Sequence, residues 1–547
     1  MAGNPAQFPE SGSAAVLGSR AALALCVSVA GFVAVGLLGP SVVTVRLAGA
    51  VAGRPPYSLG PGPPGWLALG LTAAALLVGA GGLFAALRAL RAGWVPEPRR
   101  WLAGGLAAVV GFLLVPPAAS GDALIYAAYG RTAALGGDPY IDTPRALLAA
   151  GDPVGIATEG PWQGVTSVYG PVATAVQDAA SRLGGTSMQQ TVWWLSVADA
   201  VAWIAAGLLL LALAGADRAA RSRVLVLYWL NPLLLWAVPF GGHNDGQALV
   251  FAVAALLALR RRSVVLGAVL SGALIGVAGA VKLTEGVVGL GLLWAVRRRP
   301  AAAVALCAAA GAVLAVAYLP HWPEAVHQTS SNSGFISSAS PWQWIRGLLG
   351  LVMPGSAAQR VVSIAAWASV AVVAAAVFRR LVLRSDSTGL TTGSAGAVDP
   401  DAAGRARVAD AVRAVAAVGL GWLVVGSYTL PWYDMVAWAP LMLVTASALD
   451  VILLVRTVTV CLAYVATRQV PPELAPSAAL AFVADRFRDT VSPAVHLGLV
   501  VVLVRWARRG RHPGLFGQVG AAAGGTVDPH RSRSASGQSP LVSIDLG

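Results

Sequence analysis

Asp122 lies near the start of a segment, SGDALIYAAYGR at residues 120–131, whose apolar spacing predicts a short helix. A carboxylate in the first turn of a helix caps free amide groups and is favoured by the helix dipole. Beside a substrate hydroxyl, the same carboxylate would act as a general base, because it would accept the proton of that hydroxyl. Both roles fit Asp122, and the sequence alone leaves them open.

Arg131 follows Asp122 by nine residues in the same segment. Side chains on a helix interact at spacings of three and four, so Arg131 is not expected to pair with Asp122. A guanidinium beneath a layer of lipid headgroups can bind a phosphate through two parallel hydrogen bonds. The alternative is that Arg131 anchors its helix to those headgroups.

A short polar motif, GGHNDG at 241–246, separates two strongly apolar runs. Its simplest role is a turn in which Asp245 caps the following helix. As a functional pair, His243 and Asp245 would bind sugar hydroxyls or a cation. Two side chains are too few to predict a structural metal site, because such sites use four ligands.

Lys282 is the only lysine among 38 basic residues and lies in VKLTEG at 281–286. It stands three residues before Glu285, so the two side chains can pair on one helix face. The functional alternative is that Lys282 neutralises a phosphate at the membrane surface.

Several tryptophans accompany these polar motifs. Tryptophan rings at the ends of membrane helices form an aromatic belt at the headgroup level. The alternative is that they stack on a sugar or on a prenyl chain. These residues are Trp162, Trp322, Trp342, Trp344 and Trp432.

The composition of the chain predicts the elements that must position these residues. Of 547 residues, 57% are hydrophobic and 11% are charged, against about 45–50% and about 25% in soluble domains. This excludes a disordered chain and an ordinary cytosolic enzyme. With about 20 apolar residues per crossing, we expect an all-α polytopic protein with 12–14 membrane helices, because lipid leaves open backbone groups without partners. The apolar runs lie at 21–39, 66–87, 101–116, 190–214, 224–240, 246–259, 263–281, 286–296, 301–319, 361–378, 408–428, 435–455, 457–469 and 491–505.

The basic residues cluster at alternate ends of these runs. If each run crosses the membrane once, every cluster falls on one side, which the positive-inside rule makes cytoplasmic. Both termini are then cytoplasmic, and the polar motifs gather on the outer face of the plasma membrane. The net charge of +14 therefore indicates topology and not a nucleic-acid partner. The clusters lie at 88–100, 218–223, 260–262, 297–299, 379–407 and 505–511.

Composition also predicts the parts of the chain. Residues 1–20 form a cytoplasmic tail, and residues 21–509 form one multi-span membrane domain. Within this domain, 117–189 is a large outer loop with interfacial helices, and 385–407 is a flexible cytoplasmic linker rich in Ser, Thr and Gly. Residues 510–547 are expected to be a disordered cytoplasmic tail.

The motifs of the outer face together resemble those of the C-type glycosyltransferases, which are polytopic membrane enzymes that use lipid-phosphate sugars. The closer resemblance is to actinobacterial polyprenol-phosphate-mannose-dependent α-1,6-mannosyltransferases, and it spans residues 115–450. Each motif is weak alone, so their shared order and spacing carry the resemblance. The matching positions are Asp122, Tyr126, Gly130-Arg131, 137–140, Asp152-Pro153, Trp162, Tyr169-Gly170-Pro171, Asn231-Pro232, 241–245, Lys282 and 431–433.

This resemblance implies an inverting transfer of mannose from polyprenyl-phosphate mannose to a hydroxyl of a mannan or lipoglycan, in cell-envelope synthesis. Asp122 would be the catalytic base. Arg131, Lys282 and Arg346 would bind the donor phosphate, because fixed cations stabilise charge that develops on a leaving phosphate. The sugar or the acceptor would be bound by Tyr126, Tyr169, His243, Asn244, Asp245 and Trp432.

The partners implied are the lipid-linked donor, the glycan acceptor and the bilayer. No cofactor and no protein metal site are implied, and a divalent cation stays open because the donor phosphate can complete its ligands. Two alternative functions remain. A transporter or flippase of lipid-linked sugars predicts charged residues near the midplane, and Asp199 is the acid well inside a predicted span. A transferase that uses polyprenyl-phosphate arabinose is the other alternative.

Overall fold

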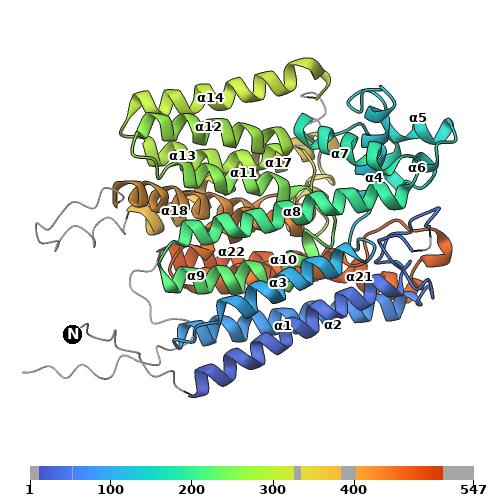
Figure 1. The fold of residues 1–547 in the computed structure, drawn as a ribbon, viewed down its shortest axis with the longest axis horizontal. Coiled ribbons are helices and arrows are strands. Elements are labelled where there is room, and N and C mark those ends of the chain that lie inside the picture. Colours follow the sequence, from blue (N-terminus) through green and yellow to red (C-terminus); the bar gives the residue numbers. More distant parts are fainter. Residues whose placement is uncertain (1–11, 52, 326–333, 384–401, 509–547) are drawn as a thin grey trace, which may run out of the picture. The chain divides into compact units, whose positions relative to one another are not determined.

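The computed structural model describes residues 12–51, 53–325, 334–383 and 402–508. Across these residues the regular structure is helical, and the only strand-like pairing is an isolated bridge between Thr44 and Ala118. The predicted all-α class is therefore confirmed (Figure 1). The predicted tail at 510–547 and most of the predicted linker at 385–407 lie outside the described residues.

Eight of the described helices are long and apolar enough to cross a membrane by length and composition. The polytopic membrane class is confirmed, although this number is below the 12–14 crossings expected from the apolar runs. The eight are α1 (Gly12–Leu38), α2 (Gly65–Arg91), α8 (Met188–Ala214), α12 (Val264–Val281), α14 with the turn after it (Pro300–His321), α17 with the turn after it (Gly355–Leu383), α18 (Ala402–Val425) and the helix that comprises α21 and α22 (Ala478–Arg508).

A proline and a polar cap break one of the shorter predicted runs. The run 224–240 is divided at Asn231, whose side chain accepts hydrogen bonds from two amides of the next turn. This cap begins α10 (Pro232–Ala237). Pro232 suits the first position of α10, because its missing N–H would have no partner there in any case. The run is therefore not one continuous crossing helix.

The predicted spans 435–455 and 457–469 are wrong, because the chain breaks inside the first and not between the two. The short helix α19 (Met435–Met442) ends early, and α20 (Ala448–Tyr464) continues through the predicted gap. A capping box at Ser447 starts α20. Its reciprocal side-chain bonds satisfy amides that a helix start leaves free.

Three of the basic clusters meet at one end of the helix bundle. Arg407, near the start of α18, donates hydrogen bonds to the carbonyl oxygens of Leu259 and Arg261 at 3.1 and 2.8 Å. Arg297 Nη1 lies 3.4 Å from Asp410 Oδ2 in the same helix. This end, which we call the basic end, agrees with the expectation that the clusters share one side.

Consecutive helices run between the basic end and the opposite end (Figure 1). α11 (Asp245–Ala258) leads to the basic end, α12 returns from it, and α13 (Val287–Val296) leads back again. α12 packs against both α11 and α14. Asp245 and Lys282 therefore lie together at the end away from the basic clusters, which we call the site end.

The segment before α8 contributes α4 (Asp122–Ala134), α5 (Pro144–Ala149), α6 (Pro153–Ile156) and α7 (Pro171–Gly184). α4 packs against α7 and α8, and its residues 123–130 are buried. Gly130 permits this packing, because a Cβ there would overlap the carbonyl oxygen of Gln177 in α7. Protein encloses α4, and so Asp122, its first residue, enters the interior of the site end.

Candidate active site

The carboxylate of Asp122 occupies the first residue of α4 and caps no backbone amide of that helix. Its Oδ1 accepts a hydrogen bond from the Ser120 hydroxyl at 2.8 Å, and its Oδ2 accepts one from the Tyr126 hydroxyl at 3.4 Å. The side chain is 21% exposed. Of the two roles that the sequence left open, the capping role is not the one seen, and the carboxylate stays accessible.

His243 lies in the turn before α11 and approaches Asp122 from the other side of the site. Its Nδ1 lies 3.5 Å from Asp122 Oδ2. Its ring stacks on Trp432, with ring centroids 3.5 Å apart and an angle of 20° between the planes. The imidazole is completely buried. These two contacts fix the orientation of the ring beside the carboxylate.

Burial sets the protonation states of this pair. It raises the pKa of Asp122, while the Ser120 hydrogen bond and the charge of Lys282 oppose that rise. Burial, and then the charge of Lys282, hold the pKa of His243 well below its usual range. The ring is therefore neutral, with one nitrogen that donates and one that accepts. The ionised carboxylate is a stronger base than that of an exposed aspartate.

Several buried polar atoms around this pair have no hydrogen-bond partner among the described residues. They are both ring nitrogens of His243 and both amide atoms of Asn244. An unpaired buried polar group costs about 1–3 kcal/mol. Hydroxyl groups of a bound substrate would satisfy these atoms.

Lys282 pairs with Asp245 and not with its near neighbour Glu285. Its Nζ lies 2.7 Å from Asp245 Oδ2. It also lies 4.9 Å from the centre of the Tyr433 ring and 5.9 Å from the centre of the Tyr169 ring. A cation over aromatic faces is further stabilised by the ring quadrupoles. The result is one buried positive charge held at the site end.

The turn before α7 holds Tyr169 in the same cluster. The amide of Gly170 donates a hydrogen bond to the carbonyl oxygen of Val281 at 3.0 Å. A Cβ at Gly170 would overlap the carbonyl oxygen of Ala280, so only glycine permits this approach. The approach brings Tyr169 edge-on to Tyr126, with ring centroids 4.7 Å apart.

A buried polar network begins at Asp434, two residues after Trp432, and the sequence predicted no partner for its arginine. Asp434 forms an ion pair with Arg456 and accepts a hydrogen bond from the Thr457 hydroxyl at 2.6 Å. The side chains of Arg456 and Asp434 are 1% and 0% exposed. The sequence feature that could have predicted this ion pair is an arginine inside an apolar helix, because a charge buried in a membrane domain requires a partner.

Two of the predicted phosphate ligands do not join the cluster. Arg131 Nε donates a hydrogen bond to Asp152 Oδ2 at 2.9 Å, from the last turn of α4. Arg346 lies in α16 (Trp342–Leu349), which has no buried residue. Of the three predicted cations, only Lys282 contacts other predicted site residues through an ion pair or an aromatic ring. The roles of Arg131 and Arg346 stay predictions.

Asp199 belongs to the surroundings of this cluster. Its Oδ1 accepts a hydrogen bond from Gln247 Nε2 at 2.7 Å, which ties α8 to α11. Within the described ranges, no three His, Cys, Asp or Glu side chains are grouped so that they could hold a metal ion. The chemistry that these side chains offer is proton removal by Asp122 and charge stabilisation by Lys282.

These features define a multi-span helical membrane protein that holds an acid–imidazole pair and a buried ion pair at one end. A C-type glycosyltransferase is expected to have this architecture. Residues 28–296 match the family described as alpha-(1->6)-mannopyranosyltransferase, N-terminal domain. This match confirms the resemblance and the glycosyltransferase class predicted from the motifs. The matched region contains Asp122, Arg131, Tyr169, His243 and Lys282.

A relative with a similar sequence is alpha-(1->6)-mannopyranosyltransferase B of Corynebacterium glutamicum. The two chains are 31% identical over 195 residues, which is 34% of this chain and 32% of the relative. The match thus spans about a third of the relative's length. No solved structure matches the chain.

Proposed function

We propose that the chain transfers a mannosyl residue from polyprenyl-phosphate mannose to a hydroxyl of a mannan or lipoglycan, with inversion, on the outer face of the plasma membrane. The names of the matched family and of the relative support the sugar and the type of reaction. The approach of His243 to Asp122 and the nearby ion pair of Lys282 support the chemistry, because a base and a cation lie in one cluster.

In the proposed reaction, Asp122 removes the proton of the acceptor hydroxyl while the hydroxyl oxygen attacks the anomeric carbon of the donor. The bond from that carbon to the phosphate oxygen breaks, and its electron pair leaves with the polyprenyl phosphate. Attack on the face opposite the leaving group inverts the configuration. Solvent later removes the proton from Asp122. The neutral His243 orients the carboxylate and binds a sugar hydroxyl.

Lys282 is the cation that stabilises the leaving group. Negative charge grows on the phosphate as the bond breaks, and a cation already held in place stabilises that charge without reorganising. The ion pair with Asp245 and the ring of Tyr433 keep Lys282 in place before the donor binds. Arg131 would serve as a second phosphate ligand only by exchanging its contact with Asp152.

The positions of the basic clusters support the proposed outer face. The positive-inside rule makes the basic end cytoplasmic. Asp245 and Lys282 lie at the opposite ends of α11 and α12 from that end. We therefore infer that a lipid-linked donor reaches the site from the outer leaflet.

The observation that carries this proposal is the 3.5 Å approach of the neutral His243 to Asp122 among unpaired polar atoms. The test measures transfer from radiolabelled polyprenyl-phosphate mannose to a short α-mannoside in membranes that contain the protein. Asp122→Asn keeps the size of the side chain and removes the base. Asp178→Asn is the matched control, because Asp178 forms an exposed pair with Arg182 in α7.

Transfer by the wild type and by Asp178→Asn, with loss in Asp122→Asn, is the expected result. Substantial transfer by Asp122→Asn would remove Asp122 from the mechanism. If the wild type is inactive where a known mannosyltransferase works, the mannose donor is wrong. Polyprenyl-phosphate arabinose then tests the alternative sugar. Movement of a lipid-linked sugar across vesicles without transfer would favour the transporter.

A further inference from the structure

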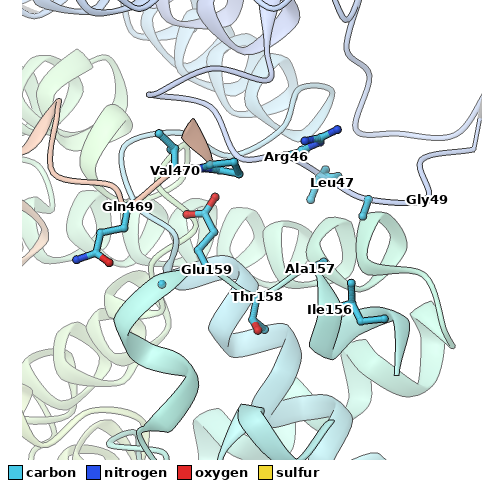
Figure 2. Close-up of a pocket in the computed structure, with 12 residues that line it drawn as sticks. Arg46, Leu47, Gly49, Ile156, Ala157, Thr158, Glu159, Gln469 and Val470 are labelled. Atoms are coloured by element: carbon cyan, nitrogen blue, oxygen red, sulfur yellow. The ribbon is translucent and has the colours of Figure 1, made fainter. Parts of the chain in front are cut away.

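A groove at the site end is formed by three segments that are far apart in the sequence (Figure 2). Its volume is about 790 Å³, within the range of about 300–1,000 Å³ typical of ligand sites. None of the residues predicted to bind substrate lines it. The segments are residues 46–49, 156–160 and 469–471.

A buried arginine holds the three segments together, and a second, exposed ion pair lies at the rim of the groove. Arg468, beside the third segment, pairs with Glu159 of the second segment, and its Nη1 donates a hydrogen bond to the carbonyl oxygen of Ser41 at 3.2 Å. Arg46 of the first segment pairs with Glu473 at 3.0 Å. Because Arg468 is 2% exposed, breaking its pair would leave a buried charge. The shape of the groove is therefore fixed by the fold.

The floor of the groove touches the start of the helix that carries the catalytic base. Figure 2 shows the Glu159 carboxylate pointing into the space between Val470 and Arg46. Its Oε2 would lie 2.8 Å from a Cβ at Gly121, the residue before Asp122. The Glu159 carboxylate, which lines the groove, thus lies against the residue that precedes Asp122.

The lining of the groove suits a neutral ligand with many hydroxyl groups. Gln469 and Thr158 offer polar atoms, whereas Leu47 and Val470 offer apolar surface for the C–H faces of sugar rings. Arg46, which lines the rim of the groove, and Arg468, which lies beside it, are each paired with a carboxylate. A phosphate site needs a cation that is free to pair with the phosphate. The lining therefore favours a glycan over a lipid phosphate.

We propose that this groove binds the inner sugar residues of a linear α-mannan acceptor, so that its terminal hydroxyl reaches Asp122. This inference rests on the proposed mannosyl transfer and adds a subsite to it. Glu159 and Gln469 bind sugar hydroxyls in the groove, and Arg46 binds at its rim.

The test compares the KM values of two acceptors, methyl α-mannoside and a linear α-1,6-linked mannotetraoside. The double variant Arg46→Ala/Gln469→Ala removes two exposed side chains of the groove and leaves the buried pair of Glu159 intact. Arg100→Ala is the matched control, because Arg100 is an exposed arginine in a surface pair with Glu97.

We expect the double variant to raise the KM for the mannotetraoside about tenfold, the effect of losing about two hydrogen bonds. The KM values for methyl α-mannoside and for the donor should stay unchanged. The Arg100→Ala variant should behave as the wild type with both acceptors.

Two kinetic outcomes would overturn the subsite while the proposed transfer stands. One is an unchanged KM for the mannotetraoside. The other is a raised KM for the donor, which would make the groove a lipid-phosphate site. If the wild type transfers nothing, the proposed function fails by itself. Binding of the mannotetraoside to the full chain in nanodiscs, measured by saturation-transfer NMR, then decides the subsite: loss in the double variant supports it, and equal or absent binding overturns it.

Discussion

The buried ion pair between Arg456 and Asp434 predicts a difference between single and double substitutions. The two side chains are 1% and 0% exposed. Asp434 follows Trp432, whose ring stacks on His243. We expect Arg456→Met and Asp434→Asn each to destabilise the protein strongly. The combined variant should be more stable than either single variant, because it leaves no unpaired charge.

The size of the expected destabilisation follows from the burial of the two side chains. Removing one partner of a buried ion pair costs about 3–5 kcal/mol, which lowers the ratio of folded to unfolded protein by about two to four orders of magnitude. The remaining hydrogen bonds, from Arg456 Nε to the Leu423 carbonyl oxygen and from Thr457 to Asp434, do not neutralise the charge left behind. By contrast, an exposed helical pair such as Arg182 with Asp178 contributes about 0.3–0.5 kcal/mol.

The assay measures the free energy of unfolding of the purified protein in detergent against increasing SDS, with Arg182→Ala as the exposed control. Transfer activity is measured on the same samples, because loosening of Trp432 should lower kcat through His243. Equal costs for the single and double variants would refute the reasoning from burial. A cost for Arg182→Ala as large as that for Arg456→Met would do the same.

Two further predictions concern catalysis. Lys282→Met should lower kcat about 10²–10³-fold, which is the effect of losing one group that stabilises transition-state charge. Steady-state kinetics with the lipid-linked donor measure this change. An unchanged kcat would contradict the role of Lys282. The acid limb of the pH profile should lie above that of an ordinary aspartate, because burial raises the pKa of Asp122 above 3.8 and the base works only when ionised. Activity is therefore lost as the pH falls through that raised pKa, and a limb in kcat/KM at or below pH 3.8 would contradict this assignment.

Composition and motif order were enough to predict the class of this protein. Long apolar runs require helices wherever lipid offers no hydrogen-bond partners, so the all-α membrane architecture followed from local sequence. The order of the polar motifs predicted the family that residues 28–296 match. Both inferences depend on residues near one another in the chain or on their order along it.

The boundaries of the shorter helices could not be predicted in the same way. The start of α20 depends on the capping box at Ser447, and the break before α10 depends on the side chain of Asn231. Apolar residues continue on both sides of each break, so periodicity alone joins or divides the runs wrongly. The actual hydrogen bonds of the caps decide where each helix begins.

The sequence by itself determined which residues are suited to chemistry, whereas the tertiary structure decided their partners. Lys282 is three residues from Glu285, yet it pairs with Asp245, which is 37 residues away. Arg131 pairs with Asp152, 21 residues away, and so it is held outside the cluster. Local spacing predicts contacts along one helix, but buried charges select partners from every element packed around them. Only the packing of α4, α11 and α12 brings Asp122 and Lys282 to one site.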